Sequence, residues 1–406
     1  MDPNPIATPD RADAATRRAR TAVVVAFLVN GLAFASVIAR TPALQSALGL
    51  SLGQFGLLLL CLSGGAVLGL PLSGPLVTRS GPARGVLLGM LSVTAGLALI
   101  GVSLLTAAVP VAALGLALCG LGSGVWDVSM NVEGADVERR VGGSLMPRLH
   151  AAFSIGTVAG AGIGAGASAV GLPLEVQLFA VAALIPLIAL PVTRPFLNHI
   201  TPKDDDGRPG VRVLDAWREP RTLLVGLLVL GFAFTEGSAN DWIAIAFVDG
   251  YGSSETVGAV AFGFFVSAMT IGRLLGGAML DRFGRVAVLR ATAVVALVGL
   301  LLVLLGGSTP VALVGALLWG IGASLGFPVG MSAAADDPER AAARVSVVSS
   351  VGYTAFLAGP PLIGLLGEHT GILRALFVVV GALVLGLLAA GAARPLPAAA
   401  PTGPPR

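Results

Sequence analysis

The stretch GAMLDRFGR, residues Gly277–Arg285, places one acid and two arginines between two long apolar runs. A similar stretch, GPLVTRSGPAR at Gly74–Arg84, stands between two earlier apolar runs. The segments VNGLAFAS (Val29–Ser36) and VLGFAFTE (Val229–Glu236) also match, in the same order and again about 200 residues apart. Matches that keep their order and spacing indicate an internal repeat, so the sequence predicts two equivalent halves.

The composition indicates a membrane protein. Of the 406 residues, 55% are hydrophobic and 12% are charged, and the mean hydropathy is +0.90. A soluble domain has about 25% charged residues, and a spanning helix needs about 20 mostly apolar ones. We therefore expect an all-α integral membrane protein with twelve transmembrane helices in two six-helix pseudo-repeats. The predicted spans are 20–39, 53–77, 85–107, 109–132, 149–170, 173–193, 221–248, 256–279, 286–305, 309–331, 345–366 and 372–393.

Polar segments divide the predicted helices into domains. The stretch TRPFLNHITPKDDDGRPGVRVLDAWREPR (Thr193–Arg221) is rich in Pro, Gly, Asp and Arg and separates the sixth run from the seventh. The predicted order is a cytoplasmic N-terminal tail at 1–19, a six-helix bundle at 20–194, a cytoplasmic linker at 195–219, a second six-helix bundle at 220–394 and a disordered C-terminal tail at 395–406.

The distribution of charge predicts the topology. The net charge is +3 and the isoelectric point is about 9.4. Basic residues cluster before the first apolar run and in alternate loops, whereas the opposite loops hold only Arg40 and Arg374. This positive-inside asymmetry places both termini in the cytoplasm. The excess charge therefore reflects insertion in a lipid bilayer, and nucleic acid is not expected as a partner. We expect a monomer in the cytoplasmic membrane of a bacterium.

The loop GAMLDRFGR resembles the Gly-x-x-x-Asp-Arg-x-Gly-Arg loop of the major facilitator superfamily, and the resemblance covers nearly the whole chain. It implies the major facilitator fold and a gate at one membrane face. Glycine permits close helix approach, the acid can cap or pair across helix ends, and the arginines hold the cytoplasmic face; alternatively, the arginines only fix the topology. The first-half copy departs from the pattern, with Thr78 where the family usually has Asp. The residues implied in gating are Gly277, Asp281, Arg282, Arg285 and Arg79.

A narrower resemblance concerns GLGSGVWDVSMN, residues Gly120–Asn131. The order of its two glycines, acid and amide is similar to the fourth-helix signature of the fucose-permease-like branch of the superfamily and its bacterial relatives. The acid of the sugar symporter's first helix would fall near Ile38, where this chain has no carboxylate. Sugar and proton specificity are therefore not implied by the resemblance.

Two predicted helices carry acids within apolar sequence, where a charged side chain costs roughly 2.5–3.5 kcal/mol on insertion scales. Asp127 has Asn131 one helical turn later, on the same face. Glu236 lies in FTEGSANDW, a poor helix-forming run that is tolerated beside protein or a watery cavity. We expect Asp127 and Glu236 to carry protons in a transport cycle. The alternative for Asp127 is a structural pair with a cytoplasmic arginine such as Arg148.

Further side chains in the predicted spans have two possible roles each. Asp241 either faces the pathway or is solvated at the outer helix end, and Arg273 either reaches the membrane interface or pairs with a membrane acid. An amide in a membrane needs a partner, whereas the aromatic residues could instead be packed or anchored at the interface. The residues expected to bind substrate are Asn30, Trp126, Asn131, Asn240 and Tyr353.

These features favour a secondary active transporter that moves a small organic solute by alternating access, coupled to protons. Sugar-type symport and metabolite or drug efflux by proton antiport both remain open, and a non-transporting sensor on the same fold is a further alternative. The two cysteines and three histidines show no metal-ligand spacing, nucleophile–base pair or phosphate-binding loop. An enzyme, a bound metal and a cofactor are therefore not expected.

Overall fold

The computed structural model of this chain describes residues 9–141, 145–197, 213–337 and 340–395. Within those ranges it contains 12 helical segments that are long and apolar enough to cross a membrane. Most of the linker predicted at 195–219 and nearly all of the tail predicted at 395–406 lie outside the described residues.

The first half consists of six long helices. They are α1 (Pro9–Ile38), α3 (Leu52–Ser80), α4 (Pro82–Thr106), α5 (Val109–Val141), α6 (Met146–Ala169) and α7 (Leu174–Thr193), with the short α2 (Thr41–Ala47) after α1. The helix α1 begins before the span predicted at 20–39, because the Ala- and Arg-rich segment ahead of it consists of good helix formers. The helix α5 also continues past the span predicted at 109–132, as far as Val141.

The second half repeats this arrangement. After the short α8 (Val213–Ala216) come α9 (Pro220–Ile245) with a π-helical end (Ala246–Gly250), α10 (Glu255–Phe283), α11 (Arg285–Leu305) and α14 (Ala341–Thr370). Two spans predicted as single helices are broken. One consists of α12 (Thr309–Ala323) and α13 (Gly326–Ala334), and the other of α15 (Ile372–Ala375), α16 (Phe377–Ala389) and a final turn at Ala390–Ala393.

The repeat is visible in the backbone of the two matching loops. Gly81, between α3 and α4, has φ 83° and ψ 159°. Gly284, between α10 and α11, has φ 76° and ψ 159°. Glycine adopts positive φ without the steric cost that a side chain brings. The second glycine of each loop motif therefore makes the same turn in both halves.

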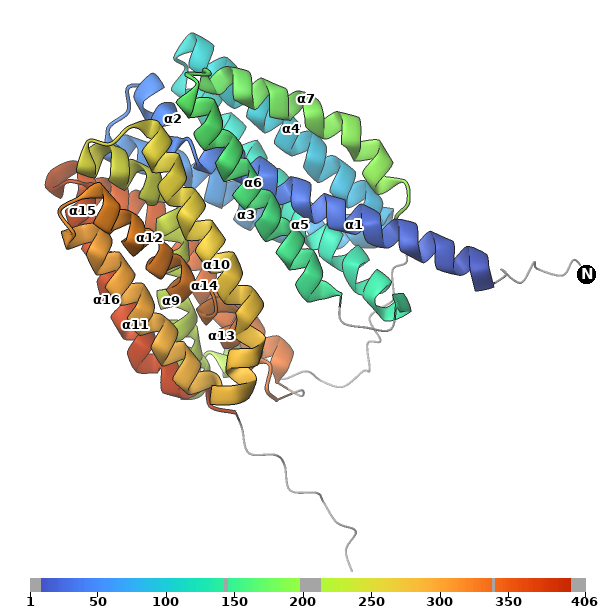
Figure 1. The fold of residues 1–406 in the computed structure, drawn as a ribbon. Coiled ribbons are helices and arrows are strands. Elements are labelled where there is room, and N and C mark those ends of the chain that lie inside the picture. The colour runs from blue at the N-terminus through green and yellow to red at the C-terminus, as the bar shows by residue number, and fades with distance from the viewer. Residues whose placement is uncertain (1–8, 142–144, 198–212, 338–339, 396–406) are drawn as a thin grey trace, which may run out of the picture.

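The two halves meet at one end of the bundle and diverge toward the other (Figure 1). We call the meeting end, near α2 and α15, the Arg40 end. The opposite end, where α7 ends and α9 begins, is the linker end. Arg40, which is 6% exposed, forms an ion pair with Glu255 of α10 (Nη2–Oε2, 3.3 Å). The hydroxyl of Thr256 donates a hydrogen bond to that of Ser168 at 3.1 Å.

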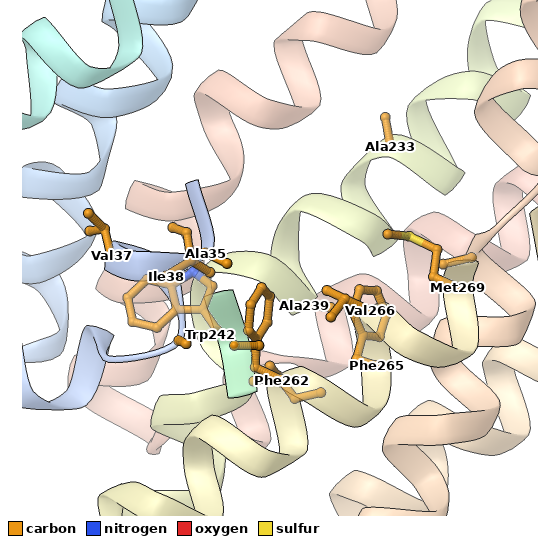
Figure 2. Packing of buried hydrophobic residues seen from close by; sticks show 14 of the residues in the cluster. Ala35, Val37, Ile38, Ala233, Ala239, Trp242, Phe262, Phe265, Val266 and Met269 are labelled. Atoms are coloured by element: carbon orange, nitrogen blue, oxygen red, sulfur yellow. The ribbon is translucent and has the colours of Figure 1, made fainter. Parts of the chain in front are cut away.

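Close packing of α3 against α14 completes this closure. A Cβ built at Gly56 would lie 2.5 Å from the carbonyl oxygen of Pro360, and one built at Gly364 would lie 2.5 Å from that of Leu52. We call this contact the α3–α14 seam. Beside it, the rings of Phe55 and Trp242 meet edge to face with centroids 6.2 Å apart. Figure 2 shows part of the apolar core shared by the halves, with Ile38, Trp242 and Phe262.

Candidate functional site

A cavity of about 310 Å³ lies between the two halves. The first half lines it from α1, α3, α5 and α6, and the second half lines it from α9 and α14. Its polar lining residues are Asn30, Ser63, Ser123, Asp127, Asn240, Asp241 and Tyr353. This volume is near the lower limit of the range of about 300–1,000 Å³ that is usual for small-molecule sites.

On the first-half side, Asp127 is exposed to the cavity and Asn30 is buried beside it. The amide of Asn131 donates to the carboxylate Oδ1 of Asp127 at 3.2 Å and to the Asp127 carbonyl at 2.8 Å. The one hydrogen-bonding contact that the Asn30 side chain makes with the described residues is a long one, from Nδ2 to the sulfur of Met130 at 3.9 Å. Asn131 therefore orients Asp127 without lining the cavity, and Asn30 keeps hydrogen-bonding capacity for a ligand.

On the second-half side, α9 presents Gly237, Asn240 and Asp241 to the cavity. These positions are spaced i, i+3 and i+4, so they share one helical face. Asp241, for which either the pathway or the solvated outer helix end was expected, lines this cavity. Within the described ranges, its carboxylate and the Asn240 amide have no hydrogen-bond partner. The helical spacing of Gly237, Asn240 and Asp241 is visible in the sequence, although the sequence analysis predicts Glu236 as the proton-carrying acid of this segment.

Glu236 is not among the residues that line the cavity and forms an ion pair with Arg273 of α10 (Oε1–Nη2, 2.9 Å). The side chains are 16% and 33% exposed. The Nε of Arg273 also donates to the carbonyl of Ser324 at 3.3 Å, just where α12 ends. Carbonyls at a helix end lack a partner within the helix. The ion pair therefore fastens α9 and α10 to the α12–α13 break, and of the two roles expected for Arg273, pairing with an acid is the one found.

Trp126, expected to bind substrate, is absent from the cavity lining in this structure. It is 0% exposed and packs within the first half against Gly89 of α4, where a built Cβ would lie 2.7 Å from the Trp126 Cβ. Glycine at position 89 lets α4 approach the backbone of α5 at Trp126 closely, so tertiary packing buries Trp126 within the first half. Asn30, Asn240 and Tyr353 do line the cavity.

At the linker end, the close helix approach expected at Gly277 is not found. A Cβ built there meets no heavy atom within 4 Å, because Gly277 faces outward. The close contacts belong to Gly272 and Gly276, where a built Cβ would lie 2.4 Å from Ser324 and from Leu325, respectively. Among the described residues, no hydrogen bond or ion pair of the exposed Asp281 is found.

The loop arginines have different surroundings. Arg282 lies over the ring of Phe283, 5.2 Å from its centroid, and Arg79 is exposed. Arg285 forms an ion pair with Asp336 (Nη1–Oδ1, 2.6 Å). Arg221 binds the other oxygen of Asp336 at 2.8 Å.

The sequence analysis does not predict a role for Asp336, although the internal repeat places an acid at both of its positions. Its counterpart 200 residues earlier, Asp136, binds Arg139 and Arg140 at 2.9 and 3.1 Å. An acid thus stands at the same position of the sequence repeat and binds arginines in both halves, within α5 in the first half and between α9 and α11 in the second.

A second group of charges joins the end of the linker to α14. Glu219 accepts hydrogen bonds from Arg344 (2.6 Å), Arg340 (2.8 Å) and the hydroxyl of Thr222 (2.8 Å). These donors favour the charged form of the acid, and the bond from Arg344 has the largest effect. Together they hold the pKa of Glu219 at about 2, below its usual value of 4.5.

Comparison with known proteins agrees with this architecture. The family model described as the Major Facilitator Superfamily matches residues 23–254 and 237–406. The chain belongs to the Major Facilitator Superfamily. The resemblance seen in the sequence is thus confirmed, and so are the all-α fold and the two-half organisation. Membership and fold identify a membrane transporter rather than an enzyme.

Relatives of this superfamily member include proteins with uncharacterised substrates. An uncharacterized transporter of Sinorhizobium fredii is 30% identical, over 88% of this chain and 93% of its own. An uncharacterized MFS-type transporter of Yersinia pestis is 29% identical, over 91% and 93%. Membrane protein MosC of Rhizobium meliloti is 27% identical, over 89% and 86%.

Solved structures share the fold of this transporter. The nucleoside transporter NupG, in a mutant form, has a TM-score of 0.75 and 15% identity, covering 92% of this chain and 99% of its own. The Escherichia coli fucose:proton symporter FucP has a TM-score of 0.63 and 15% identity, covering 93% and 98%. At this identity the likeness concerns the fold.

Proposed function

We propose that this transporter moves a small organic solute across the cytoplasmic membrane of a bacterium by secondary active transport coupled to protons. The observation that carries the proposal is the presence of one carboxylate from each half in a single cavity between the halves, Asp127 and Asp241. A carboxyl group in the substrate cavity can exchange protons during symport or antiport, and these two acids are placed to do so. The chain works as a monomer in this proposal.

The energetic reason is the burial of charge. An ionised carboxylate inside the membrane is unfavourable unless a proton, a partner or a ligand neutralises it. Asp127 has the Asn131 amide as a partner, whereas Asp241 has none among the described side chains. Protonation on one side of the membrane and release on the other would move the pair between neutral and charged states. Glu236 lies outside the cavity and is already neutralised by Arg273.

The positive-inside asymmetry assigns the linker end, and with it both termini, to the cytoplasm. The halves are fastened together at the Arg40 end, which is then the outer side. Alternating access would require those contacts to break while the linker ends approach. Asp281 is exposed in this conformation and is available to form an ion pair when the linker end closes. The other residues of the proposed gate are Gly277, Arg282, Arg285 and Arg79.

The test begins with a thermal-shift screen of purified protein, since a ligand that binds the folded state raises the melting temperature. The first solute found is then followed in liposomes under a pH gradient. Asp127→Asn and Asp241→Asn should abolish pH-driven accumulation while counterflow exchange of the solute survives. Glu175→Gln, an acid outside the cavity at the start of α7, is the matched control and should accumulate normally. If both cavity variants accumulate the solute as the wild type does, coupling takes place elsewhere.

A further inference from the structure

We propose that the solute is a small organic cation that carries a protonated amine, and that the cavity exchanges it for protons. This proposal rests on the proposed function, because it takes the cavity as the transport site and names the chemical class that fits it. The argument uses the charges, hydrogen-bond acceptors and apolar walls of the cavity.

The charged lining of the cavity has one sign. Asp127 and Asp241 face it, and no Lys, Arg or His occurs among the described residues that line it. Arg273 is bound to Glu236, outside the lining. His150 lies against the ring of Phe27, with centroids 5.4 Å apart, and is also outside the lining. An anionic solute would add a third negative charge, with no cation among the described lining residues to receive it.

The hydrogen-bonding groups of the cavity suit a solute that donates hydrogen bonds. The two carboxylates and the amide oxygens of Asn30 and Asn240 supply acceptors from both halves. A protonated primary amine has three N–H donors and no acceptor, so it can bind a carboxylate and an amide together. Hydrogen bonds to charged groups are the stronger kind. A neutral polyol could also use these acceptors, but it would leave both carboxylates to be neutralised by protons alone.

The rest of the wall suits the carbon skeleton of such a cation. Aromatic side chains come from both halves: Phe34, Phe153, Tyr353 and Phe356. Aromatic faces attract a cation within about 6 Å of the ring centre. The helix α3 adds an aliphatic wall that includes Leu59, Leu62 and Val67. The volume of about 310 Å³ limits the solute to a small one.

Charge balance then makes the transport an exchange. The pair of carboxylates is neutral with two protons bound, or with one proton and one monovalent cation. Binding of the cation therefore releases one proton from a carboxyl group to water, and departure of the cation allows that carboxylate to take up a proton again. No covalent bond changes. Within secondary transport, this exchange favours proton antiport over symport.

The sign of the cavity charge can be tested without knowing the solute. In a background of Cys61→Ser and Cys119→Ala, the variant Ser63→Cys places a thiol on the cavity wall. Its labelling rate is measured in the full-length protein with two methanethiosulfonate reagents of similar size. One carries 2-aminoethyl, an ammonium, and the other carries 2-sulfonatoethyl. Ser308→Cys, an exposed position before α12 at the Arg40 end, is the reference.

We expect the ammonium-to-sulfonate rate ratio at Ser63→Cys to exceed the ratio at the reference by about tenfold or more, because clefts of one sign concentrate the opposite charge. Adding Asp127→Asn and Asp241→Asn should bring the two ratios close together while the reference stays unchanged. An equal ratio, or faster labelling by the sulfonate, would overturn the cationic class.

A matched series of solutes gives an independent measurement. Glucosamine, glucose and glucuronate have similar rings and carry a positive, zero and negative charge, respectively. Glucosamine should protect Ser63→Cys from a neutral maleimide more than glucose or glucuronate does; the reverse order would contradict the proposal. The test of the substrate class and the test of proton coupling can fail independently of each other. A reagent ratio that favours the sulfonate refutes the substrate class alone, whereas normal pH-driven accumulation by the cavity-acid variants refutes the coupling alone.

Discussion

Glu368 of α14 accepts a hydrogen bond from the backbone N–H of Gly53, near the start of α3, with an N–Oε2 distance of 2.7 Å. A carboxylate of the second half thereby caps the N-terminus of a helix of the first half, where backbone N–H groups lack partners and a negative charge is favoured. Together with the Arg40–Glu255 pair, this contact holds the Arg40 end closed.

The first prediction follows from that cap. Glu368→Ala should increase the population that is open at the Arg40 end, because the α3 terminus then bonds to water equally well when the halves are apart. Spin labels on α3 and α14 at that end would report a longer mean distance. Glu368→Gln keeps an acceptor and should lie between Ala and wild type. Identical distance distributions for Ala and wild type would show that the cap does not hold the gate.

The second prediction concerns the α3–α14 seam. Gly56→Ala should hinder closure, because the new Cβ would lie 2.5 Å from the carbonyl oxygen of Pro360. Overpacking of this kind costs about 1–3 kcal/mol, which shifts a balance of two conformations by roughly 5- to 150-fold. Gly64→Ala, on the same helix with no heavy atom within 4 Å of its built Cβ, is the control. Transport should slow in the first variant only; equal rates in the two would contradict the role of the seam.

The third prediction distinguishes Glu236 from the cavity acids. Glu236→Gln should lower the melting temperature, because it leaves the charge of Arg273 without its acid inside the membrane. Removing one partner of a fully buried pair costs about 3–5 kcal/mol, and partial exposure places this pair below that range. The double variant Glu236→Gln with Arg273→Met should recover most of the loss. A single variant as stable as wild type would mean that the pair contributes nothing.

The fourth prediction separates gating from stability at the linker end. Asp281→Asn should slow transport without changing expression or melting temperature, because Asp281 is exposed and unpaired among the described residues in this state. Asp336→Asn should instead lower the melting temperature, since it weakens the binding of Arg221 and Arg285. Unchanged transport by Asp281→Asn would leave that acid no part in the cycle.

The fifth prediction is a dependence on pH. The pKa of Glu219 is held at about 2, chiefly by the hydrogen bond from Arg344, against a usual value of 4.5. A lowered folded-state pKa stabilises the protein above the unfolded value, and the contribution is lost as the pH falls through the folded one. The melting temperature should therefore decrease between about pH 4.5 and pH 2 by less in Glu219→Gln than in wild type. Parallel decreases in both proteins would argue against this network.

The sequence was sufficient for the fold because its signals are local. Runs of apolar residues defined the spans, and the loop around Asp281 carried the superfamily pattern that the family model confirms. The breaks after Ala323 and Ala375 were not foreseen, since the apolar composition continues through both.

The cavity was harder to predict because it depends on how the helices rotate against each other. Both Glu236 and Asp241 lie in one short segment of α9, and only the packed bundle shows which of them faces the other half. The expectation that Trp126 lines the substrate site was difficult to check from sequence for a related reason. The burial of Trp126 depends on the close approach of α4 to α5 at Gly89, which is distant from it in the sequence.

The backbone contacts of the α3–α14 seam also affect how fast the protein can turn over. Gly56 and Gly364 bring no side chain to the contact, so closing the seam freezes no rotamers there. Ordering a long side chain would cost up to about 2 kcal/mol each time. Repeated opening and closing therefore has little side-chain entropy cost at these two glycines, and the contacts that must break for the halves to part include the polar ones of Arg40 and Glu368.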